Sequence, residues 1–222
     1  MEPERVRIAV GDESVSGLLL RPADAKALYM FAHGAGAAMT HKAMESNAQG
    51  LAQRGIATLR YQFLYMEKGS KRPDPPRLAH AAVHAAAVEA IEIAPDLPLF
   101  AGGRSFGGRM TSQAQAEEPL PGVRGLAFLG FPLHPAGKNG IERAEHLARV
   151  NVPMLFVSGD RDALAELDLL RPVVSGLGER ATLHLIKHAD HSFKVAAKSG
   201  RTSAEAEAEA LDALAGWCSA LS

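Results

Sequence analysis

The sequence predicts an α/β domain with a mostly parallel, twisted sheet, an antiparallel hairpin at its N-terminal edge and helices on both faces. Short apolar runs alternate with helical patterns along almost the whole chain, which is typical of a parallel sheet flanked by helices. A turn signal at Gly11-Asp12 separates the first two apolar runs and indicates the hairpin. No repeat, low-complexity linker or change of composition divides the 222 residues. We therefore expect one domain over residues 1–222.

The first strands follow from apolar runs and turn residues. Residues 5–10 and 16–20 form the two strands of the hairpin. Ala27–Ala32 (ALYMFA) is a short, continuous apolar run, as expected of a parallel strand that is buried on both faces.

A helix, a strand and a second helix come next. Residues 42–54 have a helical pattern, and Gly55 in the C-cap position ends the predicted helix. Ile56–Tyr61 is the following strand. Residues 62–77 are polar and contain several prolines, so they predict an irregular connection. Residues 78–94 contain eight alanines and neither glycine nor proline, which strongly favours a helix.

The alternation continues to the end of the chain. Residues 164–176 are helical, with Pro172 expected to break the helix. Ser203–Ala220 closes the chain as a helix, with Ser203 as its N-cap and glutamates in its first turns. The other predicted elements are strands 97–101, 123–131, 152–158 and 182–187 and helices Phe106–Glu117 and 141–149.

Composition excludes several classes of function. The 24 basic and 25 acidic residues give a formal net charge of -1, without the basic tract that nucleic acids or anionic membrane surfaces require. The single cysteine, Cys218, excludes an internal disulfide and a multi-cysteine zinc site. The opening MEPERVRIAV has no apolar signal segment, and no apolar run could span a membrane. We expect a cytoplasmic protein.

The sharpest motif surrounds Ser105. Residues 103–107 read G-R-S-F-G and fit G-x-S-x-G, the nucleophile elbow, in which a strained turn between a strand and a helix exposes a serine. Gly103 and Gly107 leave room for the neighbouring chain, and the helix N-terminus beside Ser105 favours negative charge. A glycine-rich turn that merely packs a helix against the sheet is the structural alternative.

The chain has two glycine clusters, and neither matches a nucleotide-binding motif. Read as a phosphate loop, the segment from Gly103 has Arg109 in place of lysine and Met110 in place of the hydroxyl residue. The cluster Gly34-Ala35-Gly36 lacks the third glycine of a dinucleotide fingerprint, because position 39 is methionine. We therefore expect no cofactor.

A serine nucleophile requires an acid, and in folds with this elbow the acid follows the nucleophile and precedes the base. Asp160 and Asp162 come directly after the strand 152–158. We favour Asp162, since Gly159 can start a turn that carries it toward the serine. Asp160 and then Asp168 are the alternatives.

Three histidines follow the acid. His184 lies inside a strand pattern, where a partly buried structural role is expected, whereas His188 and His191 lie in the loop after the last strand. His191 is the stronger candidate for the base. A metal site at His188, Asp190 and His191 is the alternative, but no further ligands are spaced to complete it.

The oxyanion hole requires two N–H donors. One is the N–H of Phe106, the residue after the nucleophile, and the other belongs to the loop after Ala27–Ala32. Glycines in that loop can turn its N–H groups inward, and Ala35 is the expected donor. His33 is expected to shape the loop.

These motifs resemble the α/β-hydrolase superfamily with a core like that of dienelactone hydrolases, and more narrowly the small KANL3/Tex30-like hydrolases. Arg104 and Phe106 flank the serine where lysine and methionine are common in those relatives. The resemblance lies in six stretches: FAHGAGAAM from Phe31, RYQFLYMEKGSKRPDPPRL from Arg60, GGRSFGGRM from Gly102, GFPLHPAGK from Gly130, VPMLFVSGDRDAL from Val152 and HADHSFK from His188.

The resemblance implies a Ser105, Asp162 and His191 triad, in agreement with the residue-level interpretation. The loop 62–77 resembles a feature of the narrower family, and its Tyr65 and Arg72 follow a strand end, where ligands bind in open α/β sheets. They either line the substrate pocket or belong to a solvated surface loop.

The expected function is hydrolysis of an ester-like small molecule, a carboxylester or thioester, through an acyl-enzyme. A serine at the elbow argues against hydrolases that use an aspartate or a cysteine as the nucleophile. The segment from Pro132 to Val152 has room for one short helix and for no lid domain. The alternatives are a small peptidase or amidase, and a non-catalytic binding or scaffold protein with the same fold. The intact triad argues against a scaffold, which does not need one. The oligomeric state does not follow from the sequence.

Overall fold

The computed structural model describes all residues, 1–222, and contains one sheet of eight strands. The strand order across the sheet is β1-β2-β4-β3-β5-β6-β7-β8. The β1–β2 and β2–β4 pairs are antiparallel and all other pairs are parallel. The strands are β1 (Glu4–Val10), β2 (Glu13–Leu20), β3 (Ala27–Ala32), β4 (Ile56–Tyr61), β5 (Leu99–Arg104), β6 (Val123–Leu129), β7 (Met154–Gly159) and β8 (Ala181–Ile186).

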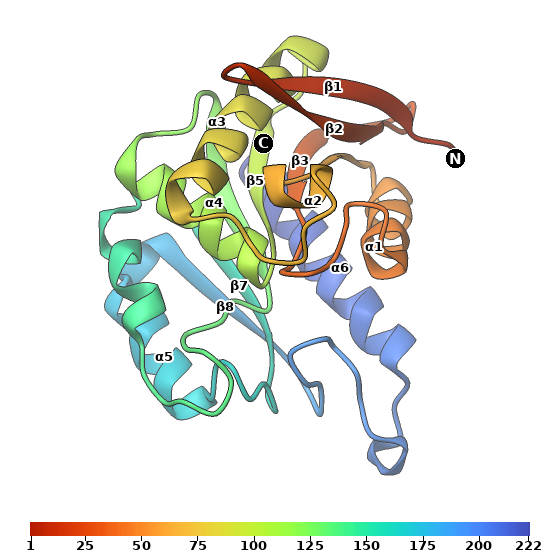
Figure 1. Cartoon of the computed structure of the whole chain (residues 1–222). Helices are drawn as coiled ribbons and strands as arrows, with labels where there is room; N and C mark the ends of the chain where they lie inside the picture. Colours follow the sequence, from red (N-terminus) through yellow and green to blue (C-terminus); the bar gives the residue numbers. More distant parts are fainter.

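Helices cover both faces of the sheet (Figure 1). Helices α1 and α6 pack in one apolar layer with one set of strand side chains, and α3, α4 and α5 pack in the other. None of the helices has both the length and the hydropathy that a membrane crossing requires. The helices are α1 (Lys42–Ala52), α2 (Leu64–Glu67), α3 (Pro76–Ile93), α4 (Phe106–Glu117), α5 (Leu167–Gly176), α6 (Ser203–Ala220) and the 3₁₀ segments η1 (Glu142–Arg149), η2 (Gly178–Arg180) and η3 (Ala197–Ser199).

The predicted fold class is confirmed, and the central strands explain why. Every residue of β3 and β4 is buried, as the continuous apolar run of β3 predicts for a strand covered by helices on both faces. The N-terminal hairpin has one exposed edge and pairs through β2 with β4. Only η1 lies between β6 and β7, so no lid covers the sheet.

Besides shifts of a few residues in element bounds, four local predictions differ from the structure. The connection 62–77 contains the helical turn α2, and the segment 141–149 forms the 3₁₀ helix η1 rather than an α-helix. Helix α5 begins only at Leu167, and Pro172 lies within it, where the missing N–H removes one hydrogen bond without ending the helix.

The fourth difference concerns the start of α6. The N-cap is Thr202, not Ser203, because Thr202 Oγ1 accepts the Glu205 N–H at 3.2 Å while the Glu205 carboxylate accepts the Thr202 N–H at 2.7 Å. This reciprocal capping box satisfies two N–H groups at once, which a cap at the next residue would not do.

The topology determines where a ligand can bind. From β3 the chain passes to β4 on one side of it, and then returns to β5 on the other side. The loops that leave the carboxyl ends of β3 and β5 therefore diverge toward opposite faces and leave a crevice between them. The loops containing Ala35 and Ser105 leave the sheet at this crevice.

Candidate active site

Ser105 occupies a strained turn between β5 and α4. Its backbone has φ 49° and ψ −113°, a combination that costs on the order of 1–3 kcal/mol for a residue with a side chain. A Cβ atom on Gly103 would lie 2.3 Å from the carbonyl oxygen of Ala32, and one on Gly107 would lie 2.6 Å from the same oxygen. The end of β3 thus requires glycine at both positions of the motif.

The structure brings Ser105, His191 and Asp162 into one chain of hydrogen bonds. Ser105 Oγ lies 2.9 Å from His191 Nε2, and His191 Nδ1 lies 2.8 Å from Asp162 Oδ2. Asp162 Oδ1 accepts the Leu164 N–H at 2.8 Å, and its side chain is fully buried. With Nδ1–H donated to the carboxylate, Nε2 is free to accept the hydroxyl proton of Ser105.

The other acids and histidines considered as candidates make different contacts. Asp160 Oδ1 accepts the backbone N–H of His188 at 2.7 Å, and Asp168 lies in the first turn of α5. His184 lies half-buried on β8, with Nε2 3.2 Å from a glutamate of α6. Asp162 is therefore the acid that contacts His191. No three His, Cys, Asp or Glu side chains are grouped so that they could hold a metal ion.

The two N–H groups predicted as oxyanion donors, those of Phe106 and Ala35, lack a backbone partner. Phe106 is the first residue of α4, so its N–H has no carbonyl partner within the helix. The N–H of Ala35 has no hydrogen-bond partner, whereas the next N–H, that of Gly36, donates to the Tyr65 hydroxyl at 3.2 Å.

A family model described as an alpha/beta hydrolase domain matches residues 25–219, from the end of the hairpin to the last helix. The chain belongs to the α/β-hydrolase family.

Solved structures of this family share the fold over nearly the whole chain. An alpha-beta serine hydrolase homologue from Coxiella burnetii is 19% identical with a TM-score of 0.76, covering 96% of this chain and 98% of that one. A dienelactone hydrolase from Anabaena variabilis is 24% identical with a TM-score of 0.74, covering 100% and 97%. A Xanthomonas campestris protein described as an α/β serine hydrolase without a lid is 18% identical with a TM-score of 0.74, covering 98% and 95%.

His33 holds the loop after β3, residues 33–41, which we call the oxyanion loop because it contains the predicted donor Ala35. Its Nε2 accepts the Phe63 N–H at 3.2 Å, so the proton resides on Nδ1, which donates to the Gly34 carbonyl at 2.9 Å. Burial lowers the pKa of His33 to about 4, which keeps the ring neutral. A neutral His33 therefore ties the loop after β3 to the segment after β4.

The loop that carries His191 is held from two sides. Asp190 Oδ1 accepts the N–H groups of Ser192 at 2.8 Å and Lys194 at 2.9 Å, which closes a tight turn around His191. On the other side, a Cβ on Gly130 would lie 2.9 Å from the His191 carbonyl oxygen and 3.3 Å from its ring. The role of Gly130 was not predicted, although a glycine inside the predicted strand 123–131 was a usable signal of a close backbone approach.

Arg104 is a second residue whose role the sequence did not indicate. Its guanidinium donates to Asn47 Oδ1 at 2.8 Å and to the Ser192 carbonyl at 3.3 Å. It also lies over the ring of Phe193, 5.2 Å from the centroid. Arg104 therefore links the elbow to α1 and to the histidine loop. The sequence shows that Arg104 lies between Gly103 and Ser105, but it does not show where the side chain points.

A cavity of about 370 Å³ opens beside the hydrogen-bonded chain. It is bounded by the oxyanion loop, the start of α1 and the histidine loop. Tyr65 and Arg72 do not line it; they border a separate depression with Lys68 and Asp74. The buried Tyr65 instead supports the oxyanion loop through Gly36, and Arg72 is exposed. The lining residues include Ala35, Ala37, His41, Met44, Arg104, Ser105, Leu129, His191 and Lys194.

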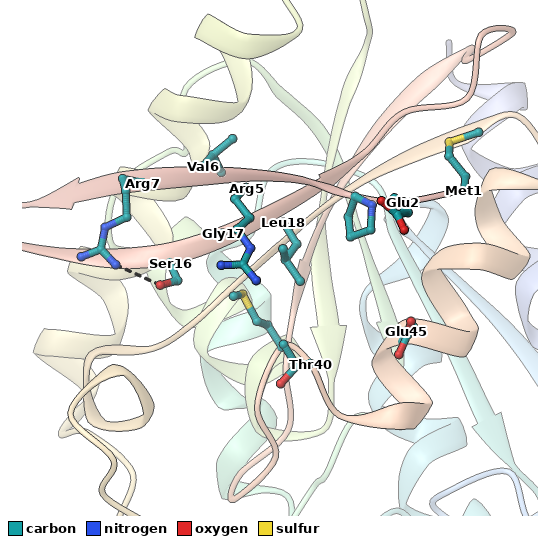
Figure 2. Close-up of a pocket in the computed structure, with 12 residues that line it drawn as sticks. Met1, Glu2, Arg5, Val6, Arg7, Ser16, Gly17, Leu18, Thr40 and Glu45 are labelled. Atoms are coloured by element: carbon teal, nitrogen blue, oxygen red, sulfur yellow. Dashed lines mark hydrogen bonds between the residues drawn. The ribbon is translucent and has the colours of Figure 1, made fainter.

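A larger hollow, of about 900 Å³, lies away from Ser105. Figure 2 shows its walls, with Glu2, just before β1, and Arg5 of β1 on one side and Thr40, just before α1, and Glu45 of α1 on the other. It contains none of the residues of the hydrogen-bonded chain, so its size does not make it the active site.

Proposed function

We propose that this α/β-hydrolase is a serine hydrolase that cleaves an ester-like substrate, a carboxylester or a thioester, through an acyl-enzyme. The observation that carries the proposal is the unbroken hydrogen-bonded chain from Ser105 through His191 to the buried Asp162, at a strained elbow. A nucleophile, a base and an orienting acid in this order are the requirements of covalent acyl transfer.

In the first half of the reaction, Ser105 Oγ attacks the carbonyl carbon while its proton passes to His191 Nε2. The carbonyl oxygen becomes an oxyanion that accepts the N–H groups of Phe106 and Ala35. A single donor of this kind typically contributes about 2.7–4 kcal/mol to stabilising the transition state. His191 then protonates the leaving oxygen or sulfur, and the acyl group stays on Ser105.

In the second half, water replaces the leaving group. His191 takes a proton from the water, whose oxygen attacks the acyl carbon, and returns that proton to Ser105 Oγ as the acid leaves. Asp162 remains ionised throughout, orients the ring through Nδ1 and offsets the positive charge that His191 gains. Its complete burial strengthens that interaction.

Proteins of similar structure support the same class of reaction. The Coxiella burnetii and Xanthomonas campestris proteins are described as α/β serine hydrolases or homologues of them, and a Rhodothermus marinus domain is described as an esterase. The serine at the elbow and the absence of a lid domain suit hydrolysis of an accessible ester. We also propose that the chain is related to the small KANL3/Tex30-like hydrolases and that each site residue has the role described above.

A screen of para-nitrophenyl esters, thioesters and anilides tests the proposal. We expect turnover of esters or thioesters that Ser105→Ala lowers by a factor on the order of 10⁴–10⁶. The exposed Ser175, on α5, is the matched control, and Ser175→Ala should keep full activity. Equal activity of the wild-type and Ser105→Ala proteins would contradict the proposal, and turnover of anilides alone would assign the site to an amidase instead.

A further inference from the structure

Two arginines, one on α4 and one on η1, have no acidic partner. No carboxylate forms an ion pair with Arg109 of α4 or Arg143 of η1. The Nε atom of Arg109 is buried without a hydrogen-bond partner, and Arg143 Nη1 donates only to the His134 carbonyl, at 3.0 Å. Buried donors on a charged group are normally satisfied, because leaving them unpaired is costly.

The environment of Arg109 adds to that cost. Burial, and after it the nearby charge of Arg143, lower the pKa of Arg109 to about 10. Burial also lowers the pKa of Arg143. Two cations that are partly removed from water and have no acidic partner would be stabilised by an anion.

Arg109 lies one helical turn from the nucleophile. Its backbone N–H donates to the Ser105 carbonyl at 3.1 Å, so the two Cα atoms are separated by about 6 Å along the axis of α4. The guanidinium carbon lies 5.7 Å from the ring centroid of Phe106, the residue whose N–H is the proposed oxyanion donor. The unpaired guanidinium therefore lies beside the side chain of Phe106, within one helical turn of Ser105.

The cavity beside Ser105 also has positive charge in its lining. Its lining contains no aspartate or glutamate. Arg104 in that lining is already balanced by Glu207, 3.8 Å away, but Lys194 is exposed and has no ion-pair partner. Lys194 at the cavity and Arg109, one helical turn from Ser105, thus both carry positive charge without an ion-pair partner.

We infer that the ester cleaved at Ser105 carries a carboxylate, which Arg109 and Arg143 bind while Lys194 attracts it from the open side. The inference rests on the proposed function and names its substrate class. A guanidinium matches a carboxylate with two parallel N–H donors, which fixes direction as well as charge. Such a contact would select anionic esters over neutral ones of the same shape.

Matched esters test the inference in two arms. In the first arm the charge is in the acyl group, with the para-nitrophenyl monoester of adipic acid against para-nitrophenyl hexanoate. In the second it is in the alcohol, with para-acetoxybenzoate against para-acetoxybenzamide. We expect kcat/KM to favour the anionic ester in one arm by about 10- to 100-fold, as for a hydrogen bond to a charged group. The arm that shows the preference identifies the charged portion.

Variants assign the preference to the arginine. Arg109→Gln should reduce the ratio of the two kcat/KM values to near unity, whereas Arg109→Lys should keep part of it through its charge. Lys194→Gln should lower the ratio less, because solvent and salt screen an exposed charge. Arg124, exposed at the start of β6, is the control, and Arg124→Gln should leave the ratio unchanged.

The outcomes separate this inference from the proposed function. If a fluorophosphonate probe labels Ser105 but the anionic ester is not preferred in either arm, or Arg109→Gln keeps the preference, the inference is wrong and the serine hydrolase stands. If the wild-type protein is neither labelled nor active on any ester, the proposed function itself fails. Labelling of Arg109→Gln at the wild-type rate shows that the variant has kept its folded site.

Discussion

At the scale of single residues, Asp162 and Asp160 are the most informative pair. They are two positions apart, follow the same strand and carry the same carboxylate. Asp162 Oδ2 lies 2.8 Å from His191 Nδ1, whereas Asp160 Oδ1 accepts the backbone N–H of His188. One carboxylate orients the candidate base and the other holds the loop that carries it. The two positions can therefore be compared directly.

Replacing each carboxylate with an amide should separate these roles. Asp162→Asn places either an amide NH₂ group or a weaker oxygen acceptor beside His191 Nδ1. Both disfavour the tautomer in which Nδ1 carries the proton. We expect kcat to fall by a factor on the order of 10⁴, as in other triads. Asp160→Asn keeps an oxygen for the His188 N–H and should retain nearly all activity. Steady-state kinetics on one ester measures both, and equal losses in the two variants would contradict the assignment.

Ser105, Asp162 and His191 could be predicted as candidates because chain order and strand ends can be derived from the sequence. The contacts around these three residues depend on the directions of side chains, which the sequence does not show. Tyr65 was expected as a residue of the pocket or of a surface loop, but its hydroxyl accepts the Gly36 N–H under the oxyanion loop. Arg104 appeared only as a departure from related motifs, yet it joins Asn47 to the histidine loop.

At the scale of elements, the close approach of β3 and β5 controls the elbow. Register places Ala32 of β3 opposite Gly103 of β5, and α4 then begins against the same strand end. The carbonyl oxygen of Ala32 occupies the space where a side chain at Gly103 or Gly107 would lie. The strand-turn-helix context predicted from the sequence thus has a steric cause in the neighbouring strand.

Adding one methyl group tests this packing. Gly103→Ala would bring Cβ to 2.3 Å from a backbone oxygen, so β3 or β5 must shift, and we expect a loss of about 1–3 kcal/mol in the free energy of unfolding. At Gly216 of α6 an added Cβ would meet no atom within 4 Å, and Gly216→Ala should instead stabilise the protein by about 0.5–1 kcal/mol. Denaturant unfolding measures both changes. A stable, fully active Gly103→Ala protein would refute the steric explanation.

Element boundaries were predictable where local signals and packing agree. The bounds of β3, β4 and α4 match the prediction, because an apolar run or a helical pattern ends there at a turn residue. The turn α2 and the 3₁₀ form of η1 were not predictable, since short segments depend on contacts from elsewhere. In α2, for example, the Tyr65 N–H donates to Asp74, nine residues along the chain.

At the scale of the whole molecule, the candidate site is a product of topology. The crevice between β3 and β5 receives the oxyanion loop and the elbow, and the loops after β7 and β8 deliver Asp162 and His191 to the same edge. Strand-helix alternation predicts such an edge in general terms, and family membership over residues 25–219 agrees with it. The net charge is near zero, yet Arg109, Arg143 and Lys194 have no ion-pair partner.

Covalent labelling of Ser105 tests the central claim most directly. Intact-protein mass spectrometry after exposure to a fluorophosphonate probe should show one adduct per folded chain, and peptide mapping should locate it on Ser105. The adduct should be absent from Ser105→Ala and from protein denatured before exposure, because only the folded site activates the hydroxyl through His191. A folded wild-type protein that takes up no probe, or a Ser105→Ala protein that is labelled as readily, would contradict the account.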